Sequence, residues 1–188
     1  LTLDELKKHP SGLTVDAEMP PYHKYLQNGF PTPSGKMEFV STRLEEEGIE
    51  GLPVYKEPTL SPVATPELTQ KFPLVLGTGI RLPMYVHSRT FRNSWNRTMY
   101  PDPCVTMNST DAADRNISDG DEVILSTPRS SIPVKAKITD TMAPGLANIY
   151  HGWPDIEVNH LIEPDYLDPI SGFPGFKSLI CEIQKAVK

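Results

Sequence analysis

The chain has 188 residues, of which 38% are hydrophobic and 22% charged, and a formal net charge of −6. This length is sufficient for one domain with one core and an additional segment. Nucleic-acid binding depends on clustered Lys and Arg, so the acidic balance argues against DNA or RNA as a partner. No apolar run approaches the roughly 18 residues that a membrane-spanning helix needs, so we predict no membrane segment.

Residues 1–70 are predicted to form an extended, mostly irregular linker segment from the preceding part of a larger enzyme. The chain begins with Leu1 and lacks a signal-peptide pattern, so we expect a piece excised from a longer chain. Short helices are expected at Leu3–Lys8 and Thr42–Glu47, and a short strand is expected after the Pro/Gly turn within residues 30–41. Frequent prolines between residues 53 and 73 predict an extended linker.

Residues 71–188 are predicted to form a compact β-rich domain with about six strands. A helix should begin near Ser109 with a hydroxyl as N-cap. Alternating apolar and polar residues at 132–138, after the turn at 128–131, predict a β-hairpin with the strand before it. Further strands are expected at 74–76, 146–150 and 179–183. Long crossover helices are absent, so a small barrel or mixed sheet is favoured over a doubly wound parallel fold.

A cluster of hydrogen-bond donors follows the first of these strands. The strand runs into Gly77-Thr78-Gly79, and the donors lie within the next residues: Thr78, Arg81, His87, Ser88, Arg92 and Asn93. Glycines allow close backbone approach, and Arg and exposed N–H groups are fixed donors, so the segment suits an anionic ligand rich in hydrogen-bonding groups. Taken alone, this pattern is more often an ordinary turn, because the third glycine of the dinucleotide fingerprint is missing.

Two later segments also carry candidate binding residues. His151-Gly152-Trp153 follows a strand, and Trp153 either stacks on a planar ring or fills the barrel end with its N–H bonded locally. The long loop at 159–177 contains Asn159, whose amide suits the edge of a heterocycle, and ends at Lys177. Such a loop is either functional or a cover for the core.

No residue of the chain is predicted to be catalytic or to bind a metal. His87, His151 and His160 lack metal-ligand spacing, and there is neither a persuasive carboxylate pair nor a Gly-x-Ser-x-Gly nucleophile motif. Cys104 and Cys181 are expected to be small core residues, although they could pair in an oxidising compartment. The donors can therefore bind a ligand, while the chemistry has to come from elsewhere.

Taken together, these segments resemble the C-terminal part of the molybdopterin oxidoreductases of the dimethyl sulfoxide reductase family. The resemblance covers nearly all of residues 30–185. Each motif is degenerate, but their fixed order is specific. The matching stretches are Thr32–Ser41; Thr78–Arg81 with His87-Ser88 and Arg92-Asn93; Met107–Ala112; Ile117–Val123; Ala143–Ala147; His151–Trp153; and Asn159–Leu161 through Asp168-Pro169 to Phe176-Lys177.

The resemblance implies a mixed β-rich α/β domain, a double-psi β-barrel with short helices. In the family, this barrel binds molybdopterin guanine dinucleotide, two copies of which hold a molybdenum or tungsten ion. The loop matching Thr78 to Ser88 lines the cofactor, the segment matching Asn108 to Asp111 lies near its nucleotide, and the Asn159 and Lys177 regions approach a pterin. The implied cofactor-binding residues are Thr78, Gly79, Arg81, His87, Ser88, Asn108, Asp111, His151, Asn159 and Lys177.

The resemblance also implies that the chain is inactive alone. The family's metal-ligating residue and any iron–sulfur cysteines lie in N-terminal domains of the same polypeptide. These domains are the expected partners, together with an electron-transfer iron–sulfur subunit in some members.

The turn Pro128–Ser131 departs from the Arg-Gly that family hairpins often carry. A non-enzymatic double-psi barrel adaptor is the alternative. A self-processing decarboxylase on the same barrel is excluded, because it requires a Gly-Ser cleavage pair and this sequence contains none.

Overall fold

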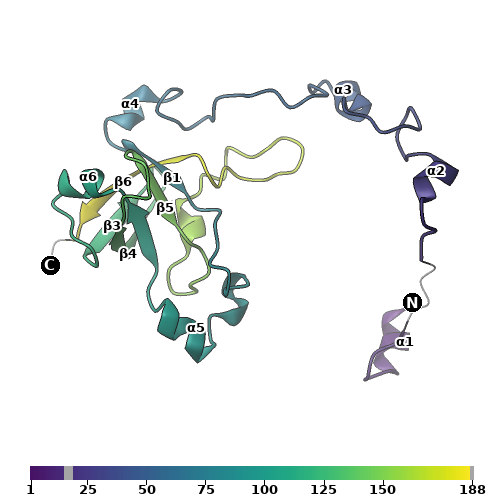
Figure 1. Cartoon of the computed structure of the whole chain (residues 1–188), viewed down its shortest axis with the longest axis horizontal. Helices are drawn as coiled ribbons and strands as arrows, with labels where there is room; N and C mark the ends of the chain where they lie inside the picture. Colours follow the sequence, from purple (N-terminus) through teal and green to yellow (C-terminus); the bar gives the residue numbers. More distant parts are fainter. Residues whose placement is uncertain (15–18, 187–188) are drawn as a thin grey trace. The chain divides into compact units, whose positions relative to one another are not determined.

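The computed structural model describes residues 1–14 and 19–186 and divides into two compact units, Leu1–Tyr55 and Lys56–Lys188. The first unit contains α1 (Leu3–Lys7), α2 (Lys24–Asn28) and α3 (Thr42–Glu46), labelled in Figure 1. None of its described residues is buried. The division falls after Tyr55, and the predicted domain boundary after residue 70 stays a prediction.

Capping residues explain where two helices of the first unit begin. The Thr2 hydroxyl accepts from the Glu5 N–H and the Glu5 carboxylate accepts from the Thr2 N–H, which is a capping box at the start of α1. Ser41 caps α3 by accepting from the Leu44 N–H. Both predicted helices are confirmed. The strand predicted within residues 30–41 is wrong, because the described residues of this unit contain no strand with which it could pair, and the segment forms turns instead.

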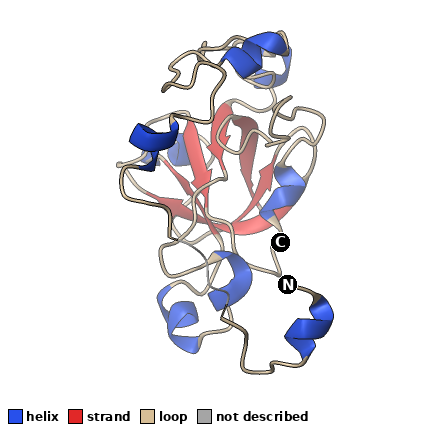
Figure 2. Ribbon diagram, turned by 90° about the vertical axis from the view of Figure 1, so that its right-hand side faces the viewer, coloured by secondary structure: helices blue, strands red, loops and turns tan. Residues whose placement is uncertain are grey.

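The second unit is a closed barrel, and the predicted fold class is confirmed. The described residues form six strands in the spatial order β1-β5-β2-β4-β3-β6. Figure 2 shows them curving around a common interior, with helices and loops outside. The pairs β1–β5 and β2–β4 are parallel and the other four are antiparallel. The strands are β1 (Leu74–Gly77), β2 (Cys104–Met107), β3 (Glu122–Ser126), β4 (Ser131–Ile138), β5 (Leu146–Ile149) and β6 (Leu179–Lys185).

Short helices connect the strands. They are α4 (Pro66–Thr69), the 3₁₀ helix η1 (His87–Thr90), α5 (Ser94–Met99), α6 (Ser109–Ala113) and the 3₁₀ helix η2 (Val158–Leu161). The predicted β3–β4 hairpin and the helix near Ser109 are confirmed. The predicted hydroxyl cap is wrong, since the Asn108 side chain accepts from the Thr110 N–H instead. In the described ranges, no helix is long and apolar enough to cross a membrane.

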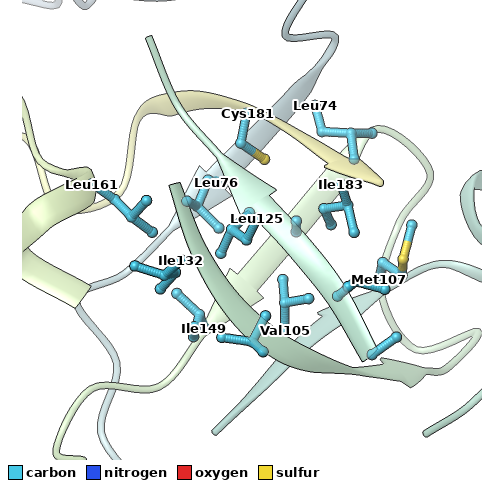
Figure 3. Close-up of a cluster of buried hydrophobic side chains, with 14 of the residues drawn as sticks. Leu74, Leu76, Val105, Met107, Leu125, Ile132, Ile149, Leu161, Cys181 and Ile183 are labelled. Atoms are coloured by element: carbon cyan, nitrogen blue, oxygen red, sulfur yellow. The ribbon is translucent and has the colours of Figure 1, made fainter. Parts of the chain in front are cut away.

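Alternating side chains from all six strands fill the barrel. Figure 3 shows Leu76, Val105, Leu125, Ile132 and Ile149 pointing toward one another, and each is at most 5% exposed. Cys181 belongs to this core, where burial raises the pKa of its thiol far above the ordinary value, whereas Cys104 is only half-buried. Both thiols are free. A second apolar cluster joins residues 82–91, which follow β1, to Trp153, which follows β5. It comprises Leu82, Tyr85, Phe91 and Trp153.

Candidate functional site

Two parallel strands bring the first predicted binding residues together. Gly77 of β1 is in register with Asn148 of β5, so the segments that follow these two parallel strands leave the barrel at the same edge. The next residues are close: Thr78 O lies 3.4 Å from His151 Nδ1, and Arg81 forms a parallel bridge with His151. The sequence could predict each segment, but only the pairing of β1 with β5 makes them neighbours.

These strand ends border a cavity of about 640 Å³. Four predicted residues line it: Thr78, Gly79, His151 and Asn159. The other lining residues are Gly152, Trp153, Pro154, Glu157, Val158, Phe173 and Phe176. A second cavity of similar volume, between residues 56–60 and 163–179, contains none of the predicted binding residues. The first cavity is therefore the candidate site.

The loop before β6 closes one wall of this cavity. In Figure 1 this yellow-green segment extends away from the strands and returns to them. The Thr78 N–H and hydroxyl both donate to the Phe176 carbonyl, at 2.6 and 2.9 Å. A Cβ on Gly79 would lie 3.0 Å from the Phe176 Cβ and 3.5 Å from the Lys177 Cε. The glycine thus allows residues 176–177 to pack directly on the end of β1, and this contact places Lys177 beside the site.

Asn96, a residue that sequence reasoning missed, holds residues 84–90 in place. Its side chain is fully buried, and Nδ2 donates to the carbonyls of Met84 and Thr90, at 3.2 and 3.0 Å. The Thr90 hydroxyl donates to the same Met84 carbonyl at 2.7 Å. Buried amide contacts to two backbone carbonyls hold the turn that follows Arg81. The side chains of the predicted residues His87 and Ser88 lie outside the described part of the structure.

Asn108 and Asp111 lie away from this cavity, near the start of β5. Because β2 runs antiparallel to β5, the end of β2 faces Ala147 and not the cavity edge. The Asn108 amide donates to the Met142 carbonyl at 2.7 Å, and the Asp111 carboxylate accepts from the Gly145 N–H at 2.7 Å. Both residues therefore hold the turn before β5, and their predicted contact with a nucleotide stays a prediction.

Trp153 lines the cavity and also belongs to the second apolar cluster. It is 5% exposed, and its ring centroid lies 5.4 Å from that of Tyr85. Its indole N–H is buried without a hydrogen-bond partner among the described residues, so the expected local bond is not formed. An unpaired buried donor costs about 1–3 kcal/mol.

Glu157 is a further lining residue that the sequence analysis did not identify. Its Oε1 accepts from the Asn159 N–H at 3.0 Å and so caps η2. The signal available in the sequence was an acid two residues before Asn159, at a helix start. Across residues 1–14 and 19–186, no group of three or more His, Cys, Asp or Glu side chains is placed to bind a metal ion.

Comparisons with known proteins identify the family to which the chain belongs. Residues 74–180 match the family model described as molydopterin dinucleotide binding domain. The dopamine dehydroxylase of Eggerthella lenta is 30% identical over 174 residues, 84% of this chain and 17% of that protein. The dimethyl sulfoxide/trimethylamine N-oxide reductase of Cereibacter sphaeroides is 31% identical over 144 residues, 69% of this chain and 16% of that protein.

The fold also has a counterpart among solved structures. Acetylene hydratase from Pelobacter acetylenicus superposes with a TM-score of 0.80 at 24% identity, over 96% of this chain and 27% of that one. The chain spans less than a fifth of the length of the two curated relatives above. The matched range 74–180 contains every residue that lines the candidate cavity.

Proposed function

Because this chain belongs to the molydopterin dinucleotide-binding domain family, the C-terminal region of dimethyl sulfoxide reductase family molybdoenzymes, we propose that its 640 Å³ cavity holds part of a molybdopterin guanine dinucleotide. One observation carries this proposal: the parallel ends of β1 and β5 place Thr78, Gly79 and His151 around one cavity with Asn159. In this proposal, two molybdopterin guanine dinucleotide molecules together hold one molybdenum or tungsten ion.

The residues present suit such a group. The cavity wall combines hydrogen-bonding side chains with the rings of Trp153, Phe173 and Phe176, as a planar, polar-edged heterocycle requires. Gly79 lets Phe176 pack closely against this wall. When bound, the cofactor supplies the metal ion at which oxidation and reduction take place. The chain's own residues orient the cofactor and exclude water.

We further propose that the fragment does not catalyse a reaction alone and that its partners are N-terminal domains of the same polypeptide. The first unit supports this, because it exposes apolar side chains and buries none of its described residues. Leu3, Tyr22, Leu26 and Phe39 are between 68% and 87% exposed. Those domains would supply the metal-ligating residue and any iron–sulfur cluster, and an iron–sulfur subunit would deliver electrons.

The proposal is tested in the full-length enzyme with Arg81→Ala and Asn159→Ala. Each variant is expected to contain less pterin and less metal per protein than the wild type, measured by fluorescence of the released pterin and by elemental analysis. Arg43→Ala, in the first unit, is the matched control, because that arginine is exposed and bonds only the Pro31 carbonyl among the contacts described for it. Unchanged pterin and metal content in both site variants would contradict the assignment.

A further inference from the structure

We propose that Glu157 recognises the 2-amino-4-oxopyrimidine edge that pterin and guanine share, and so sets the orientation in which the ring enters the cavity. This inference rests on the proposed function. Glu157 is the one carboxylate among the residues that line the cavity, and His151 is the one other ionisable side chain there. A negative group in an otherwise neutral and aromatic wall disfavours a phosphate at that position and favours a donor-rich ligand edge.

The chemistry of the ring edge matches a carboxylate. The 2-amino-4-oxopyrimidine edge presents a ring N–H and an amino N–H side by side. An ionised carboxylate only accepts hydrogen bonds, has two oxygens and accepts about four bonds in all. Hydrogen bonds to a charged acceptor are about twice as strong as neutral ones. Among the lining side chains, Glu157 therefore suits paired donors best, whereas Asn159 offers one acceptor and one donor.

Glu157 is held in place before any ligand arrives. Its Oε1 accepts from the Asn159 N–H at 3.0 Å, which leaves the carboxylate capacity for further donors. The helix that it caps is fixed to the barrel: Val158 and Leu161 are buried, and the Thr127 hydroxyl donates to the Leu161 carbonyl at 2.9 Å. Glu157 itself is exposed, so the fixed helix sets its backbone position and the bond to Asn159 restrains its carboxylate.

The aromatic wall supplies faces for the same ring. Phe173 and Phe176 both line the cavity, with centroids 6.2 Å apart and ring planes at 75°. Phe173 is 65% exposed, so its apolar face is open to a planar ligand. A flat bicyclic ring can contact an aromatic face while its edge meets Glu157.

Asp111, which the resemblance implies lies near the nucleotide, does not line this cavity. Its carboxylate accepts from the Gly145 N–H near the start of β5, as described above. Glu157 is therefore the carboxylate available to a heterocycle edge inside the cavity.

The decisive variant is Glu157→Gln in the full-length enzyme. Glutamine keeps the size of the side chain and an oxygen that can cap Asn159, but it removes the charge and introduces a donor. The apoprotein is produced in a host that makes no molybdopterin and is titrated with four probes. Pterin and guanosine monophosphate carry the 2-amino group; lumazine and inosine monophosphate are their counterparts without it.

We expect Glu157→Gln to weaken binding of pterin or guanosine monophosphate by about tenfold or more, while lumazine and inosine monophosphate change by less than about twofold. The pair that responds identifies the pterin or the guanine as the bound end. Glu163→Gln lies outside this cavity and is the control, with all four affinities unchanged. In the holoenzyme, Glu157→Gln should also lower the released pterin per protein.

The inference is overturned if the wild type binds pterin or guanosine monophosphate and Glu157→Gln binds them equally well. An equal loss for all four probes would also overturn it, because that pattern indicates a purely structural cap. The proposed function fails separately, if wild-type holoenzyme releases no pterin.

Discussion

At the scale of single residues, Gly79 determines how closely the loop before β6 approaches the barrel. Its backbone has no positive φ, so alanine is free of backbone strain there, but the new Cβ would lie 3.0 Å from the Phe176 Cβ. We expect Gly79→Ala to lower the free energy of unfolding by about 1–3 kcal/mol, as overpacking does. Urea denaturation measures this value.

Gly175→Ala is the control for this prediction. Its Cβ would meet only the rotatable Ser178 hydroxyl, at 3.3 Å, so a change below about 1 kcal/mol is expected. Equal stability of Gly79→Ala and the wild type would show that residues 176–177 do not pack on β1 in this way.

Asn96 gives a second prediction at this scale. Asn96→Ala removes a fully buried side chain and leaves the partly buried carbonyls of Met84 and Thr90 without their amide donor, which costs about 1–3 kcal/mol. Hydrogen exchange should rise in residues 84–93 more than in the barrel strands. Asn93→Ala is the control, since that exposed residue precedes α5 without a side-chain cap bond. Uniform exchange across the unit would argue against a local role.

Part of the cavity lining was among the residues predicted from the sequence. Thr78, Gly79, His151 and Asn159 were predicted, and the structure places them around one cavity. Glu157 and Asn96 were missed for a physical reason: their roles depend on backbone groups and walls that only the folded chain brings near them. No periodicity marks such residues. The binding roles of the predicted residues stay predictions.

At the scale of elements, the β3–β4 hairpin positions the helix that carries Asn159. Thr127 directly follows β3, is 5% exposed, and its hydroxyl donates to the Leu161 carbonyl of η2. Thr127→Val keeps the shape and removes the donor, so we expect a loss of about 1–2 kcal/mol in unfolding free energy, together with weaker cofactor retention. Thermal unfolding and pterin content of the full-length enzyme check both effects.

Thr98→Val is the matched control for the hairpin prediction. Its hydroxyl donates to the Ser94 carbonyl in an exposed position, and water replaces that bond, so a change within about 0.5 kcal/mol is expected. If Thr127→Val matched Thr98→Val in both measurements, the hairpin would not position η2.

Elements with a strong local signal were predicted, and the others were not. The alternation within β4 and the turn before it identified the hairpin. By contrast, β2 has only four residues and follows two prolines, at 101 and 103, so its pairing with β4 and β5 defines it more than its own pattern does. The strand expected within residues 30–41 had the right residue types but no partner strand.

At the scale of the whole molecule, the two units differ in how many of their residues are buried. The barrel unit contains the core, while none of the described residues of Leu1–Tyr55 is buried. We therefore expect a chain of residues 56–188 to melt within about 3 °C of the 188-residue chain, since removal of exposed residues changes stability little. Calorimetry of both chains provides the test, and a drop above about 5 °C would contradict it.

The fold class was predictable because the motifs occur in a fixed order, which single elements do not reveal. Six short strands fit several barrels and mixed sheets, and the resemblance selected among them. The strand order, with β1 between β5 and β6, is a property of the closed barrel. No local pattern encodes it.

That closure links folding to the completion of the cavity. β1 begins the barrel in sequence and β6 ends it, yet they are neighbours, with Leu76 in register with Leu179. The entropy of bringing such distant segments together is lost before their contacts form, so we expect this pairing to be a slow, late step of folding. Phe176 lies three residues before β6, and its carbonyl accepts both Thr78 hydrogen bonds. A newly made chain thus acquires its ligand wall in the same step that completes its fold, and an incompletely folded chain has no finished site in which to retain a cofactor.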